Sequence, residues 1–297
     1  MDGATLVLGV SGSAASMLAL DVLLRRIRTG DRAERRRGDC AFALVAVHVD
    51  ETPMPFSCAP PGDVLNAMRD RVNAAAAATQ SAASAAAFAS LVRVECIHID
   101  EQHQHHHRLD ADAVHDALMD VADLTAREDC ARTLRFRALE RFARGIMHAT
   151  DTTAEKENTR AAVVRLLTCE TSVRVAARAL ALVAKGQGHL LRQESPSTLA
   201  MQDVTPKDAA LAARHLKIQV FGAMPRGAAE QPSINSATDA FVEQMHADMP
   251  RTAPTILRTL AKLEPLESAN TEDDDDNDDD EQQQRHDDEN GGACGGR

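Results

Sequence analysis

The sequence predicts an α/β fold in which helices cover both faces of a parallel β-sheet, so that the protein has three layers. The first observation is that short apolar runs, typical of buried strands, alternate along the chain with longer stretches of helical periodicity. The second is the start of the chain, where a predicted strand at residues 5–10 leads through small residues into a leucine-rich helix at 16–27. Alternation at this spacing is typical of a parallel sheet with helical crossovers.

The next elements continue this alternation. Residues 41–50 predict a second buried strand that ends at Asp50, and the prolines after it indicate a loop. Residues 63–90 are rich in alanine and predict a helical stretch. The third strand is predicted at 91–100, and a polar, histidine-rich loop follows it.

The second half of the chain predicts two more strands and their helices. Residues 112–148 have a helical pattern that we interpret as two helices. The later elements are a strand at 161–168, a helix at 171–184, a strand at 197–204, and a helix at 207–215 with Pro206 in its first turn.

Charge is distributed unevenly along the 297 residues. Residues 268–297 hold 12 of the 45 acidic side chains and only 2 of the 33 basic ones, so they contribute −10 of the net charge of −12. So much charge of one sign with so few apolar residues predicts a disordered acidic tail. The rest of the chain is close to neutral, so its charge does not exclude a polyanionic partner.

The cysteines and the apolar runs indicate where the protein works. The six cysteines are scattered without a Cys-x-x-Cys pair, which favours a reducing compartment over a disulfide framework. The first residues do not form a signal-like segment, and no apolar run reaches the length that spans a bilayer. We therefore expect a cytoplasmic protein without membrane association.

The loop after the first predicted strand is the first candidate for a binding site. Ligands bind beyond the carboxyl ends of parallel strands, so this loop, Asp50 and residues 168–172 should share one cleft. Small residues at a helix N-terminus offer amide and hydroxyl donors to a phosphate. The candidates are Ser11, Gly12, Ser13 and Ser16. The alternative is a tight strand-to-helix turn capped by serine, because Walker and dinucleotide patterns are absent.

The same loop resembles a known phosphate-binding loop. Residues 11–16, "SGSAAS", resemble the PP-loop of ATP-pyrophosphatases, whose pattern is Ser-Gly-Gly-x-Asp-Ser. Ser13 stands in place of the second glycine and Ala15 in place of the aspartate. The later "VHVDETPMPF" is similar to the Asp-Glu signature of that superfamily and makes Asp50 and Glu51 candidates for the cleft. The resemblance implies a PP-loop, adenine nucleotide alpha hydrolase-like fold.

Residues 233–265 carry a more specific resemblance. They are similar to the C-terminal region of the cytoplasmic tRNA 2-thiolation protein 2 family, where a Phe-x-x-x-Leu/Met-Gln/His segment leads to Pro-x-Thr, Arg-Thr and Lys-Leu. The matching residues are Phe241, Met245, His246, Pro250, Thr252, Arg258, Thr259, Lys262 and Leu263. The alternative is a pair of amphipathic helices that packs on the sheet.

This second resemblance implies a function. It implies a subunit of the cytosolic complex that 2-thiolates the wobble uridine (U34, mcm5s2U) of the tRNAs for Lys, Glu and Gln. The implied partners are a catalytic thiolation subunit in a heterodimer, tRNA, and a thiocarboxylated ubiquitin-related modifier as sulfur donor. Because Ala15 replaces the loop aspartate, we expect no catalytic residue, no cofactor and at most weak binding of ATP.

The resemblances divide the chain into three parts. We predict a degenerate PP-loop α/β domain at 1–232, a C-terminal helical segment at 233–267 that packs on it, and the disordered acidic tail at 268–297.

No metal site is predicted. The histidines between positions 98 and 107 lie in a polar loop without a cysteine partner or a fixed helical spacing. Cys96 and Cys169 fall near predicted strand ends, but a lone cysteine is more often a small buried hydrophobic residue than a ligand.

Clustered arginines are the candidates for contact with tRNA phosphates, since guanidinium groups bind phosphate oxygens. They are Arg25, Arg26, Arg35, Arg36, Arg37, Arg132 and Arg135. The alternative is a solvated helix face paired with acids.

Two other functions stay open at this point. An active ATP-pyrophosphatase with a reduced loop is one. A nucleotide-binding module like the universal stress proteins is the other, because the strand, loop and helix at the start of the chain suit that fold too.

Overall fold

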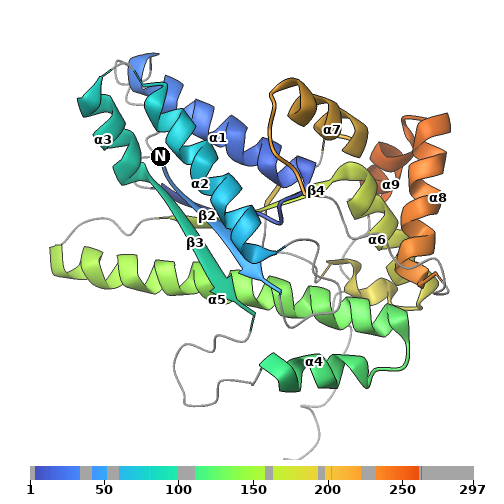
Figure 1. Ribbon diagram of the computed structural model, residues 1–297. Helices are drawn as coiled ribbons and strands as arrows, with labels where there is room; N and C mark the ends of the chain where they lie inside the picture. The colour runs from blue at the N-terminus through green and yellow to red at the C-terminus, as the bar shows by residue number, and fades with distance from the viewer. Residues whose placement is uncertain are drawn as a thin grey trace, which may run out of the picture. The chain divides into compact units, whose positions relative to one another are not determined.

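The structure is a computed structural model, and it describes residues 4–33, 42–51, 60–79, 81–99, 111–157, 163–192, 198–201, 203–221, 232–260 and 262. Within these residues five strands form one parallel sheet in the order β3-β2-β1-β4-β5 (Figure 1). The strands are β1 (Ala4–Gly9), β2 (Phe42–Asp50), β3 (Val92–His98), β4 (Val164–Thr171) and β5 (Thr198–Met201). The predicted α/β fold with a parallel sheet is confirmed.

Helices cover both faces of this sheet because successive side chains of a strand point to opposite faces, and the central strands carry apolar side chains on both. The helices are α1 (Ala14–Ala33), α2 (Pro61–Ala77), α3 (Ala82–Leu91), α4 (Ala111–Met119), α5 (Leu124–Glu157), α6 (Ser172–Ala184), α7 (Pro206–His215), α8 (Ile234–Asp248) and α9 (Thr252–Leu260). Leu8 and Leu44 pack into one cluster with α1, α2, α3 and α7. Val7 and Val45 pack on the opposite face with residues of α4 and α5. Figure 1 shows these two helices on the other side of the sheet from α1, α2 and α3. Each of these two strands therefore contributes apolar side chains to the core on both faces of the sheet.

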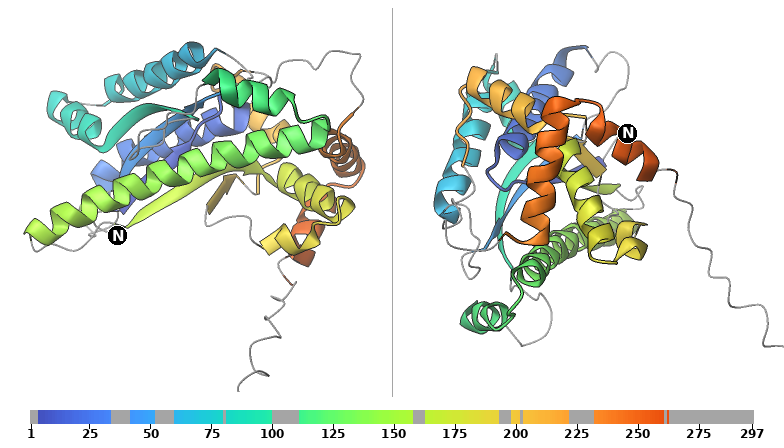
Figure 2. Two further views of the ribbon diagram at one scale, coloured as in Figure 1. Left: turned by 90° about the horizontal axis from the view of Figure 1, so that it is seen from below. Right: turned by 90° about the vertical axis from the view of Figure 1, so that its right-hand side faces the viewer.

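The last two helices pack on α6 rather than on the sheet (Figure 2). Val173, Ala176 and Ala177 of α6 form a buried cluster with Val242 of α8 and Ala253 of α9. The small alanine side chains leave room for the larger Val242, which is completely buried. Residues 263–297, which include the predicted acidic tail, lie outside the described residues.

Polar side chains fix the start of α8 against α5 and the end of α6. Ser233 Oγ donates to Glu128 Oε2 at 2.7 Å, and Asn235 Nδ2 donates to Asp129 Oδ1 at 3.0 Å. Lys185 Nζ pairs with the other oxygen of Asp129 at 2.6 Å. This network orients the C-terminal helices by direction-dependent contacts in addition to apolar burial.

The helical stretch predicted at 63–90 is interrupted, and α2 and α3 are separate helices. Thr79 Oγ1 donates to the carbonyl oxygen of Ala76 at 2.7 Å. Ser81 Oγ then accepts a hydrogen bond from the N–H of Ser84 at 3.1 Å and caps α3. Helix propensity alone did not predict the break, because short polar side chains satisfied the backbone there instead.

The prediction placed the fourth strand about three residues too early, because β4 runs from Val164 to Thr171. Thr168 and Thr171 pair with Leu199 and Met201 of β5, with an irregularity between them. The polar sequence of 168–171 hid this continuation. Because the strand continues to Thr171, the polar side chains of Thr168, Glu170 and Thr171 lie at the carboxyl edge of the sheet.

The strand order creates a switch point between β1 and β4. From β1 the chain runs outward through β2 and β3, and it then returns to the other side of β1 as β4. The connections that leave β1 and β4 therefore diverge, and a crevice opens between them, where open α/β sheets bind ligands. In the described part of the chain, no helix has both the length and the apolarity to cross a bilayer.

Candidate functional site

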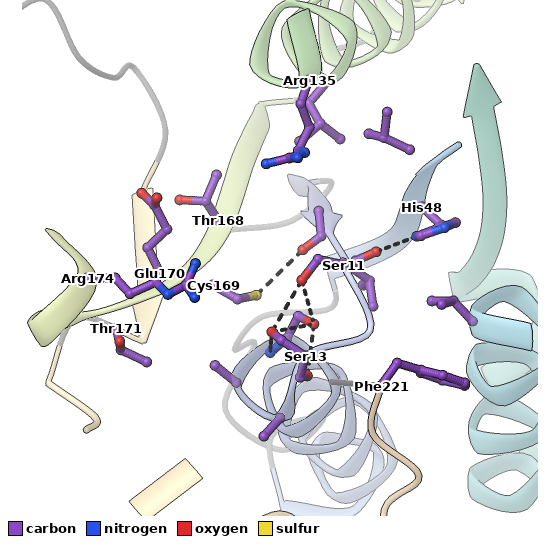
Figure 3. Close-up of a pocket in the computed structure, with 18 of the residues that line it drawn as sticks. Ser11, Ser13, His48, Arg135, Thr168, Cys169, Glu170, Thr171, Arg174 and Phe221 are labelled. Atoms are coloured by element: carbon purple, nitrogen blue, oxygen red, sulfur yellow. Dashed lines mark hydrogen bonds between the residues drawn. The ribbon is translucent and has the colours of Figure 1, made fainter. Parts of the chain in front are cut away.

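A pocket of about 370 Å³ lies at this switch point. Its walls come from the β1–α1 loop, the end of β2, the middle of α5, the end of β4, the first turn of α6 and Phe221. Figure 3 shows the serine loop in the centre, with Thr168 and Thr171 on one side and His48 on the other. The first loop, Glu51 and residues 168–171 therefore line one pocket, as the strand order requires.

Gly12 gives the β1–α1 loop its shape. Its φ is +84°, a left-handed conformation that side chains with a Cβ rarely adopt. A Cβ there would lie 3.1 Å from Val64 Cγ2 and 3.1 Å from Phe221 Cδ2. The carbonyl oxygen of Gly12 also accepts a hydrogen bond from the N–H of Phe221 at 2.9 Å. A glycine is therefore required at this position.

The three loop serines hydrogen-bond to one another. Ser11 Oγ donates to Ser13 Oγ, and Ser13 Oγ donates to Ser16 Oγ, each at 3.2 Å. Ser16 Oγ donates to the carbonyl oxygen of Ser13 at 3.0 Å, and Ser13 Oγ accepts from the N–H of Ser16 at 3.4 Å. Ser13 therefore caps α1, and the hydroxyl groups stabilise the turn without any ligand.

His48 supports the same loop from β2. Its Nδ1 lies 2.8 Å from the carbonyl oxygen of Val10, and the ring is buried. Because a carbonyl oxygen only accepts, Nδ1 carries the proton. The imidazole thus holds the loop in place.

Cys169 lies beside the loop at the end of β4. Its Sγ donates to the carbonyl oxygen of Gly9 at 3.6 Å. Burial, together with the smaller effect of the neighbouring charge of Glu170, raises the pKa of the Cys169 thiol to about 12. The thiol stays protonated at neutral pH, so Cys169 is a poor nucleophile in this form.

We expect iodoacetamide at pH 8 to alkylate Cys169 at least about tenfold more slowly than Cys130, which is exposed on α5. Only the thiolate reacts, and a thiol with a pKa of about 12 is almost entirely protonated at pH 8. Peptide mapping by mass spectrometry after short reaction times measures both rates. In the urea-unfolded chain the two thiols should react alike, and equal rates in the folded protein would contradict the assignment.

Two ion pairs neutralise carboxylates of the pocket. Arg135 of α5 pairs with Glu51, with Nη2 2.8 Å from Oε2. Arg178 of α6 pairs with Glu170. Asp50, in contrast, is not among the lining residues, and its Oδ2 lies 3.1 Å from His98 Nδ1. Successive residues of β2 face opposite sides, which separates Asp50 from Glu51.

Among the described residues, the other arginine candidates do not line the pocket. Arg25 pairs with Asp21 one helical turn earlier at 2.7 Å, and Arg26 is exposed on α1. Arg132 of α5 has its guanidinium carbon 5.5 Å from the centre of the Phe136 ring. Residues 35–37 fall outside the described residues.

Several residues that line the pocket were not predicted from the sequence. Arg174 and Glu243 come from α6 and α8, and Phe221 follows α7. Arg174 was detectable in principle, because it lies in the first turn of a helix that follows a predicted strand. Phe221 carries no such signal, since its position depends on the hydrogen bond to Gly12.

Comparison with known proteins identifies the fold. No protein-family model and no curated protein sequence matches the chain. The U34-tRNA thiolase NcsA from Methanococcus maripaludis, solved with its 4Fe–4S cluster, matches with a TM-score of 0.54 and 12% identity over 89% of this chain and 75% of its own. An NAD+ synthetase from Burkholderia pseudomallei matches with a TM-score of 0.37 and 16% identity over 86% and 79%. The chain is therefore similar in fold to the solved thiolase, with a PP-loop, adenine nucleotide alpha hydrolase-like α/β fold.

Proposed function

We propose that this protein is a non-catalytic subunit of the cytosolic complex that 2-thiolates the wobble uridine of the tRNAs for Lys, Glu and Gln. It pairs with a catalytic thiolation subunit and helps to bind tRNA, while a thiocarboxylated ubiquitin-related modifier supplies sulfur to the complex. The observation that carries the proposal is the pocket itself. It lies where a PP-loop fold binds its ligand, yet its loop lacks the carboxylate of an active PP-loop.

The fold comparison supports the reaction class. The solved thiolase acts on U34 of tRNA, and it is similar to this chain along most of the chain's length. The sequence resemblance at 233–265 favours the same tRNA modification. The fold and this resemblance therefore support the same proposal.

The pocket supports a non-catalytic role. ATP-dependent adenylation needs a magnesium ion on the phosphates, and carboxylate oxygens are the ligands that magnesium prefers. Ala15 offers no carboxylate in the loop. Glu51 and Glu170 are engaged by Arg135 and Arg178, and Glu243 is exposed on the α8 side. We therefore assign no catalytic role to these residues.

The described cysteines do not fit an iron–sulfur cluster like that of the solved thiolase. Such a cluster needs several thiolates close together. Cys96, Cys130 and Cys169 lie on three different elements, β3, α5 and β4. The described residues contain no group of three or more His, Cys, Asp or Glu side chains able to hold a metal ion. No step of the proposed function passes through a cluster on these residues.

Pyrophosphate release tests the non-catalytic assignment. The purified full chain is incubated with ATP, magnesium and unmodified tRNA for Lys, and we expect no release above background. Release that depends on Ser11, and is lost in Ser11→Ala, would show an active ATP-pyrophosphatase instead. Binding of ATP by a chain that associates with neither tRNA nor another subunit would favour a stress-protein-like module.

Binding of tRNA gives a second, direct measurement. Arg25 and Arg26 are the described candidates on α1, and both lie outside the pocket. Arg25→Gln combined with Arg26→Gln should weaken tRNA binding at least about threefold at 0.1 M salt. The matched control is Arg144→Gln with Arg137→Gln, which removes the same charge from exposed positions on α5. Equal binding by both double variants would show that Arg25 and Arg26 of α1 do not contribute to tRNA binding.

A further inference from the structure

We propose that the end of β4 and the first turn of α6 form a phosphate subsite that needs no metal ion. Thr168, Thr171 and Arg174 hold one phosphate group, which belongs either to a free nucleotide or to an RNA backbone. This subsite is separate from the serine loop on α1. The inference goes beyond the proposed function, and it does not depend on which tRNA the protein serves.

Two buried hydroxyl groups point to the subsite. Thr168 and Thr171 are only 5% and 4% exposed, and both line the pocket. Neither Oγ1 atom has a hydrogen-bond partner among the described residues. Buried hydroxyl groups are almost always paired, because an unpaired one loses its hydrogen bonds to water. A ligand that accepts hydrogen bonds in the pocket would explain both.

The first backbone N–H groups of α6 receive no hydrogen-bond acceptor from a capping side chain. Thr171 is the N-cap residue of α6, yet its side chain makes no capping hydrogen bond. Elsewhere in the described chain, Thr205 caps α7 and Ser233 caps α8 with hydrogen bonds of 3.1 Å and 3.0 Å. The first N–H groups of α6 therefore lack the partner that such a residue usually supplies, and this end of a helix attracts anions.

Arg174 supplies the positive charge. It lies in the first turn of α6, its side chain is exposed, and it lines the pocket. Figure 3 shows the side chain turned toward Cys169 and the serine loop. Within the described residues Arg174 has no ion pair, whereas Arg135 and Arg178 each hold a glutamate. Arg174 is therefore able to bind an anion without releasing a carboxylate.

Phosphate is the anion that fits this donor set. A phosphate group has several oxygens, so it accepts from a guanidinium, from helix N–H groups and from two hydroxyls at once. The positive charge of Arg174 offsets the negative charge of the phosphate, so no magnesium ion is needed. Glu243, the exposed carboxylate of the pocket wall, opposes this charge. Removing it should strengthen anion binding, whereas removing a magnesium ligand would weaken it.

The experiment measures binding of pyrophosphate to the full chain by calorimetry in buffer with EDTA. We expect Arg174→Gln to raise the Kd at least about tenfold, the loss of one charge-assisted hydrogen bond. Arg144→Gln, the matched control on α5, should leave the Kd unchanged. Glu243→Gln should lower the Kd about two- to threefold.

Thr171→Val separates a binding role from a structural one. Valine has the same shape but no hydroxyl, so the variant should keep or raise the Tm of the ligand-free protein while it raises the Kd for pyrophosphate at least about threefold. A Thr171→Val protein that binds pyrophosphate like the wild type would overturn the proposal. So would an Arg174→Gln protein with an unchanged Kd, or a wild-type chain that binds pyrophosphate only when magnesium is present.

Two further probes identify the source of the phosphate. ATP in EDTA represents a free nucleotide, and an anticodon stem-loop RNA without terminal phosphates represents a backbone. The probe whose Kd rises in Arg174→Gln, but not in Arg144→Gln, is the ligand class of the subsite. If neither probe binds the wild type, the subsite proposal fails, whereas the thiolation proposal is decided separately by the state of cellular tRNA.

Discussion

Gly12→Val should lower the free energy of unfolding by about 2–5 kcal/mol. The left-handed φ of +84° costs a residue with a Cβ about 1–2 kcal/mol. The added side chain must also displace Val64 and Phe221, each 3.1 Å from the position of the new Cβ. Overpacking of this kind costs a further 1–3 kcal/mol or so.

Urea unfolding followed by circular dichroism measures this change. The matched control is Gly145→Val on α5, where an added Cβ would meet no atom within 4 Å. Valine and glycine are both poor helix formers, so the control should change the unfolding free energy by less than about 0.5 kcal/mol. If the two variants are equally stable, the loop does not have the strained geometry described here.

Val242→Asp should release α8 and α9 from α6 and lower the unfolding free energy by at least about 3 kcal/mol. Val242 is completely buried in the cluster with Val173, Ala176 and Ala253. An aspartate there loses the burial of a valine, about 1.5–3 kcal/mol, and also places a carboxylate among apolar atoms without a partner.

Gln244→Asp is the control, because it introduces the same side chain at an exposed position two residues further along α8. We expect it to resemble the wild type in urea unfolding. Limited proteolysis supplies the second measurement: cleavage between α7 and α9 should accelerate only in Val242→Asp. An unchanged cleavage rate in that variant would contradict the docking of α8 through Val242.

The strands were the most predictable part of the fold. Runs such as 42–50 are apolar on both faces, which is typical of strands covered by helices on both sides. Local sequence did not predict where polar side chains interrupt a helix or continue a strand. Ser81 divides the predicted helical stretch because it caps the start of α3, and the polar residues 168–171 continue a strand.

The candidate site was predictable in its location but not in its composition. The β1–α1 loop and the segment 168–171 follow from strand order, since a switch point lies at the carboxyl ends of neighbouring strands. The pairing of Arg135 with Glu51 joins residues 84 positions apart. Phe221, which follows α7, contacts the loop through a hydrogen bond from its N–H to the carbonyl oxygen of Gly12. Contacts of that sequence separation depend on the whole fold.

The state of the wobble uridine in cells tests the central claim most directly. Total RNA from cells with and without the gene is run on a gel that contains a mercury compound, which retards thiolated tRNA, and is probed for the tRNAs for Lys, Glu and Gln. We expect the retarded bands to disappear without the gene and to return with a wild-type copy. Retarded bands of unchanged intensity in cells that lack the gene would contradict a role in wobble-uridine thiolation.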